Sequence, residues 1–199
     1  MSDEETMAVY AQAAEDYGKG FARAKDTFHE PDYAAFVAGL PEGGTVLDLG
    51  CGPGHWAARF RDDGYRVTAV DASPEMAAYA KETFGIEVRV AEFKDIEIDA
   101  MFDGIWAFFS LLHAPRNDFP GHLLRLHRAL VPGGQLSLGM KLGEGEGRDT
   151  LGRFYSYYSE EELTGLLGAA GYTVLSTRRG NGKGLAGAAE TFVVVTAHA

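Results

Sequence analysis

The stretch Thr45–Trp56, TVLDLGCGPGHW, decides the fold of this chain. An apolar run carries one acidic residue, Asp48, and then meets glycines at every second position, Gly50, Gly52 and Gly54. This pattern predicts a buried strand that ends in a tight turn and leads into a helix. In an open sheet of parallel strands, ligands bind beyond the carboxyl ends of the strands. The turn is therefore a candidate binding loop.

Strand patterns and helix patterns alternate after this stretch, which predicts an α/β fold with a parallel sheet covered by helices on both faces. The last two strands are joined by a glycine-rich segment without a helix, which predicts an antiparallel hairpin at one edge. The expected strands are 45–50, 66–71, 86–90, 102–109, 135–141, 172–179 and 190–199, and the expected helices are 55–64, 73–85, 117–130 and 159–171.

The organisation of the chain indicates one domain, residues 1–199. Residues 1–42 precede the first strand and form a predicted N-terminal helical cap, with helix over about 7–38 and a second segment after Pro31. The predicted core is 43–199. Glycines and charges dominate residues 142–154, LGEGEGRDTLGRF, which predicts a mobile loop and a lid at the tyrosines that follow it.

Composition limits the function classes. Hydrophobic residues make up 46% of the chain and charged residues 24%, and no apolar run reaches the ~20 residues that span a bilayer. The acidic N-terminus does not resemble a secretory signal, so a cytoplasmic location is expected. A net charge of −11 disfavours nucleic acid as a partner. His122 and His127 lack the i, i+4 zinc spacing, so no metal is expected.

The glycine loop differs from the dinucleotide fingerprint. That fingerprint is G-x-G-x-x-G, whereas the spacing here is G-x-G-x-G. Pro53 removes one N–H from the turn, and His55 stands where the last glycine would fall. Asp71 ends the second strand, where a carboxylate can accept the hydroxyls of a ribose. The residues predict a site for an adenosine whose 5′ substituent is not a phosphate.

Five motifs in order carry a family resemblance: VLDLGCGPG, VTAVDASPEM, AEFKDIEI, FDGIWAFFSLLH and LVPGGQL. Over residues 45–140 the chain resembles the class I methyltransferases that use S-adenosylmethionine. The resemblance implies a Rossmann-like, doubly wound, seven-stranded and mainly parallel sheet. It also implies methyl transfer to a small-molecule acceptor, with S-adenosylhomocysteine as the product of the cofactor.

The resemblance also implies roles for individual residues. Glycines would lie along the methionine part, Asp48 would orient its ammonium, and Asp71 would hold the ribose. Glu92 stands where many relatives have Asp beside the adenine. Tyr10 matches a helix that folds over the methionine carboxylate in many relatives. The implied cofactor site comprises Tyr10, Asp48, Gly50, Cys51, Gly52, Gly54, Asp71, Ala72, Met76, Glu92, Phe93 and Phe108.

The acceptor side is less defined. Its candidate residues are Phe109, His113, Tyr155 and Tyr158. His113 is the candidate catalytic residue, although a lone histidine near a loop is more often structural. A general base is needed only for acceptors that are protonated at neutral pH. Three functions stay open: a small-molecule methyltransferase, a non-catalytic module that binds S-adenosylmethionine, and an NAD-dependent oxidoreductase. Monomer and homodimer are both compatible with the sequence.

Overall fold

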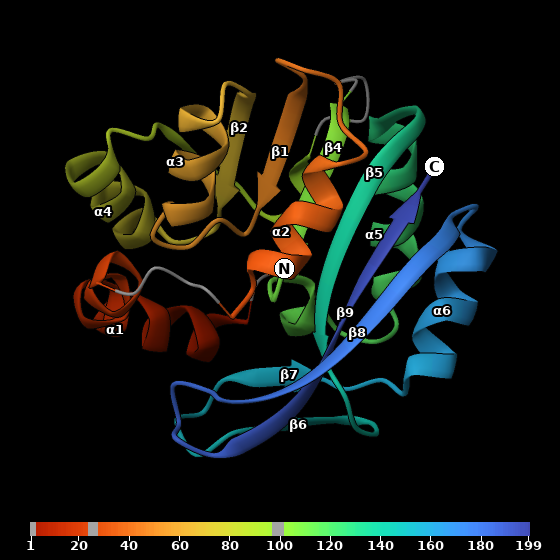
Figure 1. Cartoon of the computed structure of the whole chain (residues 1–199). Coiled ribbons are helices and arrows are strands. Elements are labelled where there is room, and N and C mark those ends of the chain that lie inside the picture. Colours follow the sequence, from red (N-terminus) through yellow and green to blue (C-terminus); the bar gives the residue numbers. More distant parts are fainter. Residues whose placement is uncertain (1–2, 24–27, 97–101) are drawn as a thin grey trace.

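The computed structural model describes residues 3–23, 28–96 and 102–199, with only the backbone described for 15–23. Residues 24–27 of the predicted cap and 97–98 of the AEFKDIEI motif lie outside these ranges. Seven of the described strands form one sheet in the order β3-β2-β1-β4-β5-β9-β8 (Figure 1). They are β1 (Thr45–Leu49), β2 (Arg66–Asp71), β3 (Val88–Val90), β4 (Phe102–Phe108), β5 (Leu130–Lys141), β8 (Thr173–Lys183) and β9 (Ala189–His198).

Strand directions confirm the predicted topology. β1 pairs in parallel with β2 and β4, and β4 pairs in parallel with β5. β9 runs antiparallel to both β5 and β8. The β8–β9 hairpin is longer than expected, because pairing extends through Gly180 and Gly182 to Lys183. The order reverses beside β1, so the glycine turn lies at the switch point of the sheet.

Two of the helices begin at serine caps. The Ser73 hydroxyl accepts from the Met76 N–H and the Ser159 hydroxyl accepts from the Glu162 N–H. No helix in the described ranges has both the length and the apolar content to cross a membrane. The helices are α1 (Glu4–Arg23), α2 (Glu30–Val37), α3 (His55–Asp62), α4 (Pro74–Phe84), α5 (Phe119–Ala129) and α6 (Glu160–Ala169), with short 3₁₀ turns η1 (Phe93–Asp95) and η2 (Leu111–His113).

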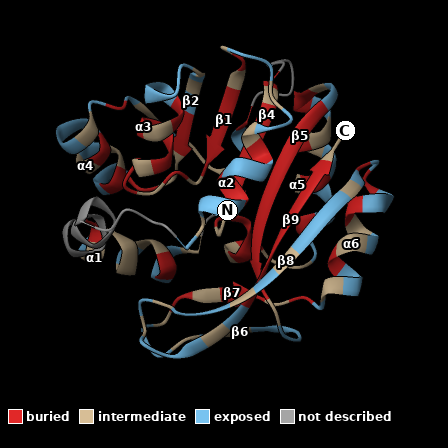
Figure 2. Ribbon diagram, viewed as in Figure 1, coloured by how far each residue is buried: buried red, intermediate tan, exposed pale blue. Residues whose placement is uncertain are grey.

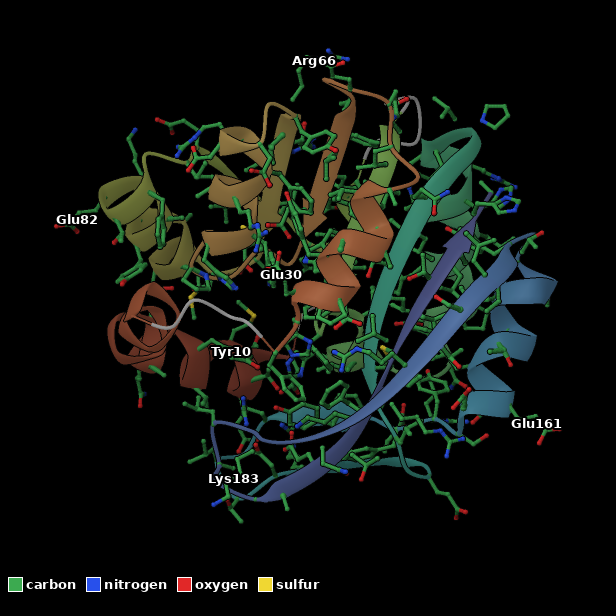
Figure 3. The ribbon with its side chains drawn as sticks, viewed as in Figure 1. Tyr10, Glu30, Arg66, Glu82, Glu161 and Lys183 are labelled. Atoms are coloured by element: carbon green, nitrogen blue, oxygen red, sulfur yellow. The ribbon has the colours of Figure 1, made fainter. Side chains whose placement is uncertain are left out.

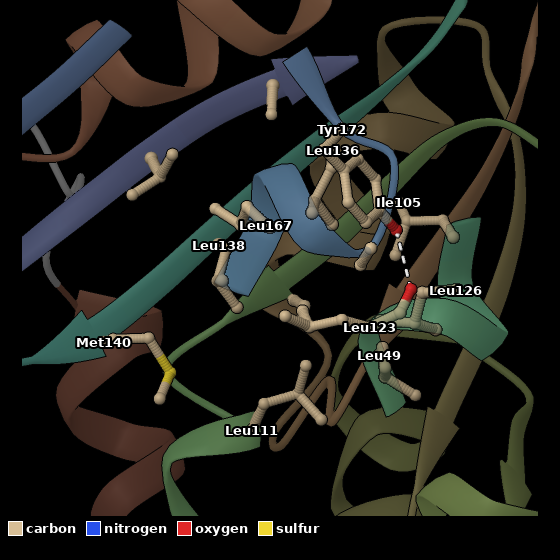
Figure 4. Packing of buried hydrophobic residues seen from close by; sticks show 14 of the residues in the cluster. Leu49, Ile105, Leu111, Leu123, Leu126, Leu136, Leu138, Met140, Leu167 and Tyr172 are labelled. Carbon is tan, nitrogen blue, oxygen red and sulfur yellow. Dashed lines mark hydrogen bonds between the residues drawn. The ribbon is translucent and has the colours of Figure 1, made fainter. Parts of the chain in front are cut away.

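Successive side chains of the strands point to opposite faces of the sheet, so the core has a layer on each face. On β4, Ile105 packs in the larger cluster, which includes Leu123 of α5 and Tyr172 (Figure 4). Trp106, the next residue, packs on the other face against Phe36 of α2. The Tyr172 hydroxyl donates to the Leu123 carbonyl at 3.3 Å, which satisfies its buried polar atom. The central strands are buried along most of their length, as Figure 2 shows.

The segment predicted as a mobile loop contains a strand instead. β6 (Glu146–Arg148) pairs antiparallel with β7 (Phe154–Ser156). The charges that suggested a loop are largely paired: Arg148 contacts Asp3 at 2.7 Å, and Arg153 contacts Asp149 at 2.6 Å. The loop prediction was wrong for this reason. The β6–β7 hairpin is thereby tied to the start of α1.

Candidate active site

A cavity of about 620 Å³ opens at the carboxyl ends of the parallel strands. Figure 1 shows α1 beyond the ends of β1 and β2, and Figure 3 labels Tyr10 on that helix. The lining comes from α1, the glycine turn, the ends of β2 and β4, the loop after β3, and α5. This volume and placement are typical of a small-molecule site in an α/β fold.

Each of the three glycine positions in the turn favours glycine for a different structural reason. All three have positive φ: +69° at Gly50, +52° at Gly52 and +81° at Gly54. A Cβ on Gly50 would lie 2.3 Å from that of Ser110, whereas a Cβ on Gly52 would meet nothing within 4 Å. A Cβ on Gly54 would lie 2.7 Å from that of Ala80. Gly54 therefore allows the turn to approach α4. It is not among the described residues that line the cavity, and its contact with the cofactor stays a prediction.

Replacing Gly54 by alanine is expected to lower the free energy of unfolding by about 3 kcal/mol. The alanine would have to adopt a left-handed backbone conformation, and its Cβ would overlap that of Ala80. Gly52→Ala is the matched control, because it has the left-handed backbone without the overlap, and it should cost only about 1 kcal/mol. Urea denaturation of both variants measures the difference. Equal losses for the two variants would contradict a packing role for Gly54.

Asp71 lies at the end of β2 and holds the glycine turn in place. Its carboxylate accepts from the Gly52 N–H at 2.8 Å and from the Ser73 N–H at 2.9 Å. Burial raises the pKa of Asp71 despite these hydrogen bonds. A carboxylate has about four acceptor positions. Asp71 therefore retains acceptor capacity toward the cavity that it lines.

Asp48 is the more isolated acid. Its residue is 2% exposed, and within the described part of the chain its Oδ2 has no hydrogen-bond partner. Burial, followed by the nearby charge of Asp71, raises the pKa of Asp48 to about 8. A buried unsatisfied carboxylate is costly. Because Asp48 lines the cavity, a cationic donor bound there would satisfy it.

His113 is held by protein groups on both ring nitrogens. Arg153 donates to the Tyr10 hydroxyl at 3.1 Å, so that hydroxyl donates onward to Nε2 of His113 at 2.9 Å. Nδ1 of His113 donates to the Phe154 carbonyl at 2.6 Å. Burial lowers the pKa of His113 to about 4. The imidazole is therefore neutral, with its proton on Nδ1.

Aromatic rings form the wall at the end of β4. Trp106 and Phe108 stack with ring centroids 4.4 Å apart, and His29 meets Phe108 edge-on at 4.7 Å. Phe109 has φ of 56°, a strained conformation for a bulky side chain. Its N–H donates to the Gly139 carbonyl at 3.1 Å. This backbone bend turns the Phe109 ring into the cavity lining.

Comparison with known proteins agrees with this geometry. Residues 46–134 match a family model described as a methyltransferase domain. A crystal structure of the Burkholderia thailandensis 1,6-didemethyltoxoflavin-N1-methyltransferase, with 1,6-didemethyltoxoflavin and S-adenosylhomocysteine bound, aligns with a TM-score of 0.77 and 26% identity, covering 98% of this chain and 87% of that one. Residues 46–134 are thus similar to a methyltransferase domain, and the fold of the chain is similar to that of methyltransferases solved with S-adenosylhomocysteine bound.

Curated methyltransferases match over part of their length. An uncharacterized methyltransferase of Staphylococcus carnosus is 29% identical over 66% of this chain. A malonyl-(acyl-carrier protein) O-methyltransferase of Pseudescherichia vulneris is 33% identical over 65% of this chain. The matched region spans 64% and 51% of those two relatives.

The residues at this site fit S-adenosylmethionine, the cofactor that the similarity implies. The unsatisfied Oδ2 of Asp48 suits an ammonium, and the open side of Gly52 leaves room for a ligand chain beside the turn. Most residues implied by the resemblance are brought together in one lining: Tyr10, Asp48, Gly50, Cys51, Gly52, Asp71, Ala72, Met76, Glu92, Phe93, Phe108, Phe109 and His113. Their individual roles stay predictions.

Two predicted pocket residues of the methyltransferase are absent from the described lining. Tyr155 lies behind His113, with ring centroids 4.7 Å apart, and the Lys141 ammonium stands 3.4 Å from its ring centre. Tyr158 packs on Phe119 at 4.8 Å. Both tyrosines are buried because they support the wall from behind. Their predicted contact with the acceptor does not agree with this geometry.

Sequence reasoning missed other lining residues of the methyltransferase, among them His29, His55, Asn117 and Arg125. Burial lowers the pKa of His55 to about 4. The available signal for His29 was its spacing from Asp32 in HEPD, because i, i+3 side chains meet at a helix start. That pattern is common, and the sequence does not show which histidines approach the cavity.

Proposed function

We propose that this protein transfers a methyl group from S-adenosylmethionine to a small-molecule acceptor. The observation that carries the proposal is the pair of buried acids at the glycine turn. Asp48 and Asp71 both line the cavity, and burial raises the pKa of each. A ligand with a cationic amino-acid end and a ribose would supply the missing donors.

Each part of the lining has a proposed task. Asp48 binds the ammonium, and Asp71 accepts from the ribose hydroxyls while it keeps the turn closed. Met76 and Phe93 provide apolar contact for the adenine, beside Glu92, whose carboxylate is 2.9 Å from the Lys94 ammonium. When bound, the cofactor supplies an electrophilic methyl group on a positively charged sulfur. The protein aligns the acceptor with that methyl and excludes water.

The proposed acceptor is small because α1 contributes to the lining through Thr6, Met7 and Tyr10 and limits access. The Burkholderia relative is named for a small heterocyclic substrate, whereas the Pseudescherichia relative is named for a carrier-protein thioester. Because these names disagree on the acceptor, the relatives do not identify the compound. The choice of a small molecule is supported by the size of the cavity.

An NAD-dependent oxidoreductase has weaker support. A pyrophosphate needs free backbone N–H groups at the turn. Here the Gly52 N–H already donates to Asp71, the Gly50 and Cys51 N–H groups donate to the Val70 carbonyl, and Pro53 has none. The acids of the turn would also repel a phosphate.

Two measurements test the proposal. Calorimetry is expected to detect S-adenosylhomocysteine binding in the micromolar range and no comparable binding of NADH. Incubation with methyl-labelled S-adenosylmethionine and a panel of phenols, carboxylates and N–H heterocycles should label at least one compound. Absence of binding at millimolar ligand would refute the proposal that S-adenosylmethionine is the cofactor. Binding without any transfer would favour the non-catalytic module instead.

A further inference from the structure

Phe109 directly follows β4 and has an unusual backbone conformation. Within the described ranges it is the only residue other than glycine with a positive φ, 56°. Such strain persists only where the surrounding structure imposes it, and it is concentrated at binding and catalytic sites. The Phe109 N–H donates to the Gly139 carbonyl of β5 at 3.1 Å, which holds the bend in place.

The bend brings two aromatic rings together at the cavity. Successive side chains of a regular strand point to opposite faces of the sheet, which would separate Phe108 from Phe109. Their ring centroids instead lie 4.7 Å apart, with the ring planes at 76° to each other. Trp106 stacks on Phe108 at 4.4 Å, and Phe192 of β9 meets Phe109 edge-on at 5.3 Å. Phe108 and Phe109 thus form an aromatic corner that lines the cavity and is supported by its neighbours.

Gly139 of β5 makes room for this aromatic corner. It pairs with Phe108 in the β4–β5 register and lies in a buried stretch of the strand. Its φ is not positive, so its backbone does not require glycine. A Cβ on Gly139 would lie 3.2 Å from Cδ2 and 3.3 Å from Cε2 of the Phe109 ring, closer than ordinary contact. Glycine inside a strand often marks such a close approach, and here the Phe109 ring occupies the space of the missing side chain.

The aromatic corner lies beside the proposed cofactor contacts. Those contacts follow the sheet from the loop after β3, through Asp71 at the end of β2, to Asp48 in β1. The next strands in the sheet are β4 and β5, which carry Phe109 and Gly139. The acceptor has to approach from a side that the cofactor leaves open. We therefore expect the acceptor at the ends of β4 and β5, against the corner.

We propose that Gly139 is a specificity-determining residue, which sets the depth of the acceptor pocket by leaving the space that the Phe109 ring occupies. This inference rests on the proposed function. The acceptor class that suits the corner is a planar aromatic compound, because its ring can stack on one phenylalanine and meet the other edge-on. A side chain at position 139 would push the Phe109 ring toward the cavity, which would exclude larger rings first.

Two variants change the pocket in opposite directions. Gly139→Ala adds one carbon behind Phe109, whereas Phe109→Leu removes part of the ring. The readout is the ratio of kcat/KM for a two-ring acceptor to that for its one-ring counterpart, with naphthol and phenol, or benzimidazole and imidazole, as the probes. Gly139→Ala should lower this ratio about tenfold and Phe109→Leu should raise it about tenfold, as one methylene group does in an apolar pocket. The opposite signs give a measurable shift whichever size the wild type prefers.

A double variant tests whether the Phe109 ring transmits the effect. In the Phe109→Leu background, Gly139→Ala should change the ratio by less than about threefold, because the ring that it displaces is absent. Gly147→Ala in β6 is the matched control, since its Cβ would meet nothing within 4 Å, and it should leave the ratio unchanged. A crystal structure of Gly139→Ala with S-adenosylhomocysteine should show the Phe109 ring displaced toward the cavity.

Binding of S-adenosylhomocysteine separates the two proposals. Its Kd should stay within about twofold in Gly139→Ala, which also reports an intact fold. An unchanged ratio, an equal loss for both ring sizes, or a tenfold weaker Kd would overturn the role of Gly139 and leave the proposed function standing. Should Gly139→Ala fail to fold, the ratio in Phe109→Leu decides, and an unchanged ratio there overturns the role. Failure of the wild-type protein to bind the cofactor product or to methylate any compound would overturn both.

Discussion

Replacing Asp71 by alanine is expected to weaken S-adenosylhomocysteine binding roughly 100-fold, equivalent to about 2.7 kcal/mol. Two losses combine in this variant. The ribose hydroxyls lose a charged acceptor, and the Gly52 and Ser73 N–H groups lose the carboxylate that orders the turn. Charged hydrogen bonds of this kind contribute about 1.5–3 kcal/mol each. Calorimetry at fixed pH and salt measures the change in Kd.

Two further variants separate binding from folding. Asp71→Asn keeps one oxygen as an acceptor, so it should retain more affinity than Asp71→Ala. Asp62→Ala, which removes an exposed acid from α3, should bind like wild type. A folded Asp71→Ala protein whose Kd lies within threefold of wild type would contradict the ribose role.

Replacing Asp48 by asparagine is expected to move stability and binding in opposite directions. The pKa of Asp48 is about 8 in the folded chain and about 3.9 in an unfolded one. Between these values the folded chain holds a proton that the unfolded chain has released, so raising the pH through this window favours unfolding. Asparagine has no such proton. The variant should therefore gain at least about 1 kcal/mol over wild type between pH 5 and pH 8.

Binding should fall in the same variant, because an amide attracts an ammonium less strongly than a carboxylate does. A loss of about tenfold or more in S-adenosylhomocysteine affinity is expected at pH 8. Urea denaturation at pH 5 and pH 8 and calorimetry at pH 8 measure the two effects. A stability difference that does not change with pH would show that Asp48 is not the group with the raised pKa.

Much of the fold was predictable because its signals are local. Strands such as 102–108 carry dense apolar runs, and Ser73 and Ser159 are helix caps that act within one turn of chain. The β6–β7 hairpin was not predicted, because its strands are only three residues long and its contacts, such as that of Arg148 with Asp3, join residues far apart in the sequence. Composition alone gave that segment the appearance of a loop.

The residues on the cofactor side of the site were predictable for the same reason, because their signals are local. Asp48, Gly52 and Asp71 belong to strand ends and one turn, whose positions relative to each other are fixed by the register of β1 and β2. Their spacing in sequence thus translates directly into spacing in the site. Gly54 has a second reason that the sequence does not show, because its close approach to α4 depends on how the turn packs.

The sequence by itself determined the sheet, the glycine turn and the pair of acids, because hydrophobic periodicity and strand register act over short distances. The tertiary structure decided the acceptor side. Tyr155 and Tyr158 are not among the described residues that line the cavity, and His113 is engaged on both nitrogens. The ring of His29 meets that of Phe108, far away in the sequence. Side-chain direction and hydrogen-bond partners across such distances depend on how whole elements pack, which no local pattern specifies.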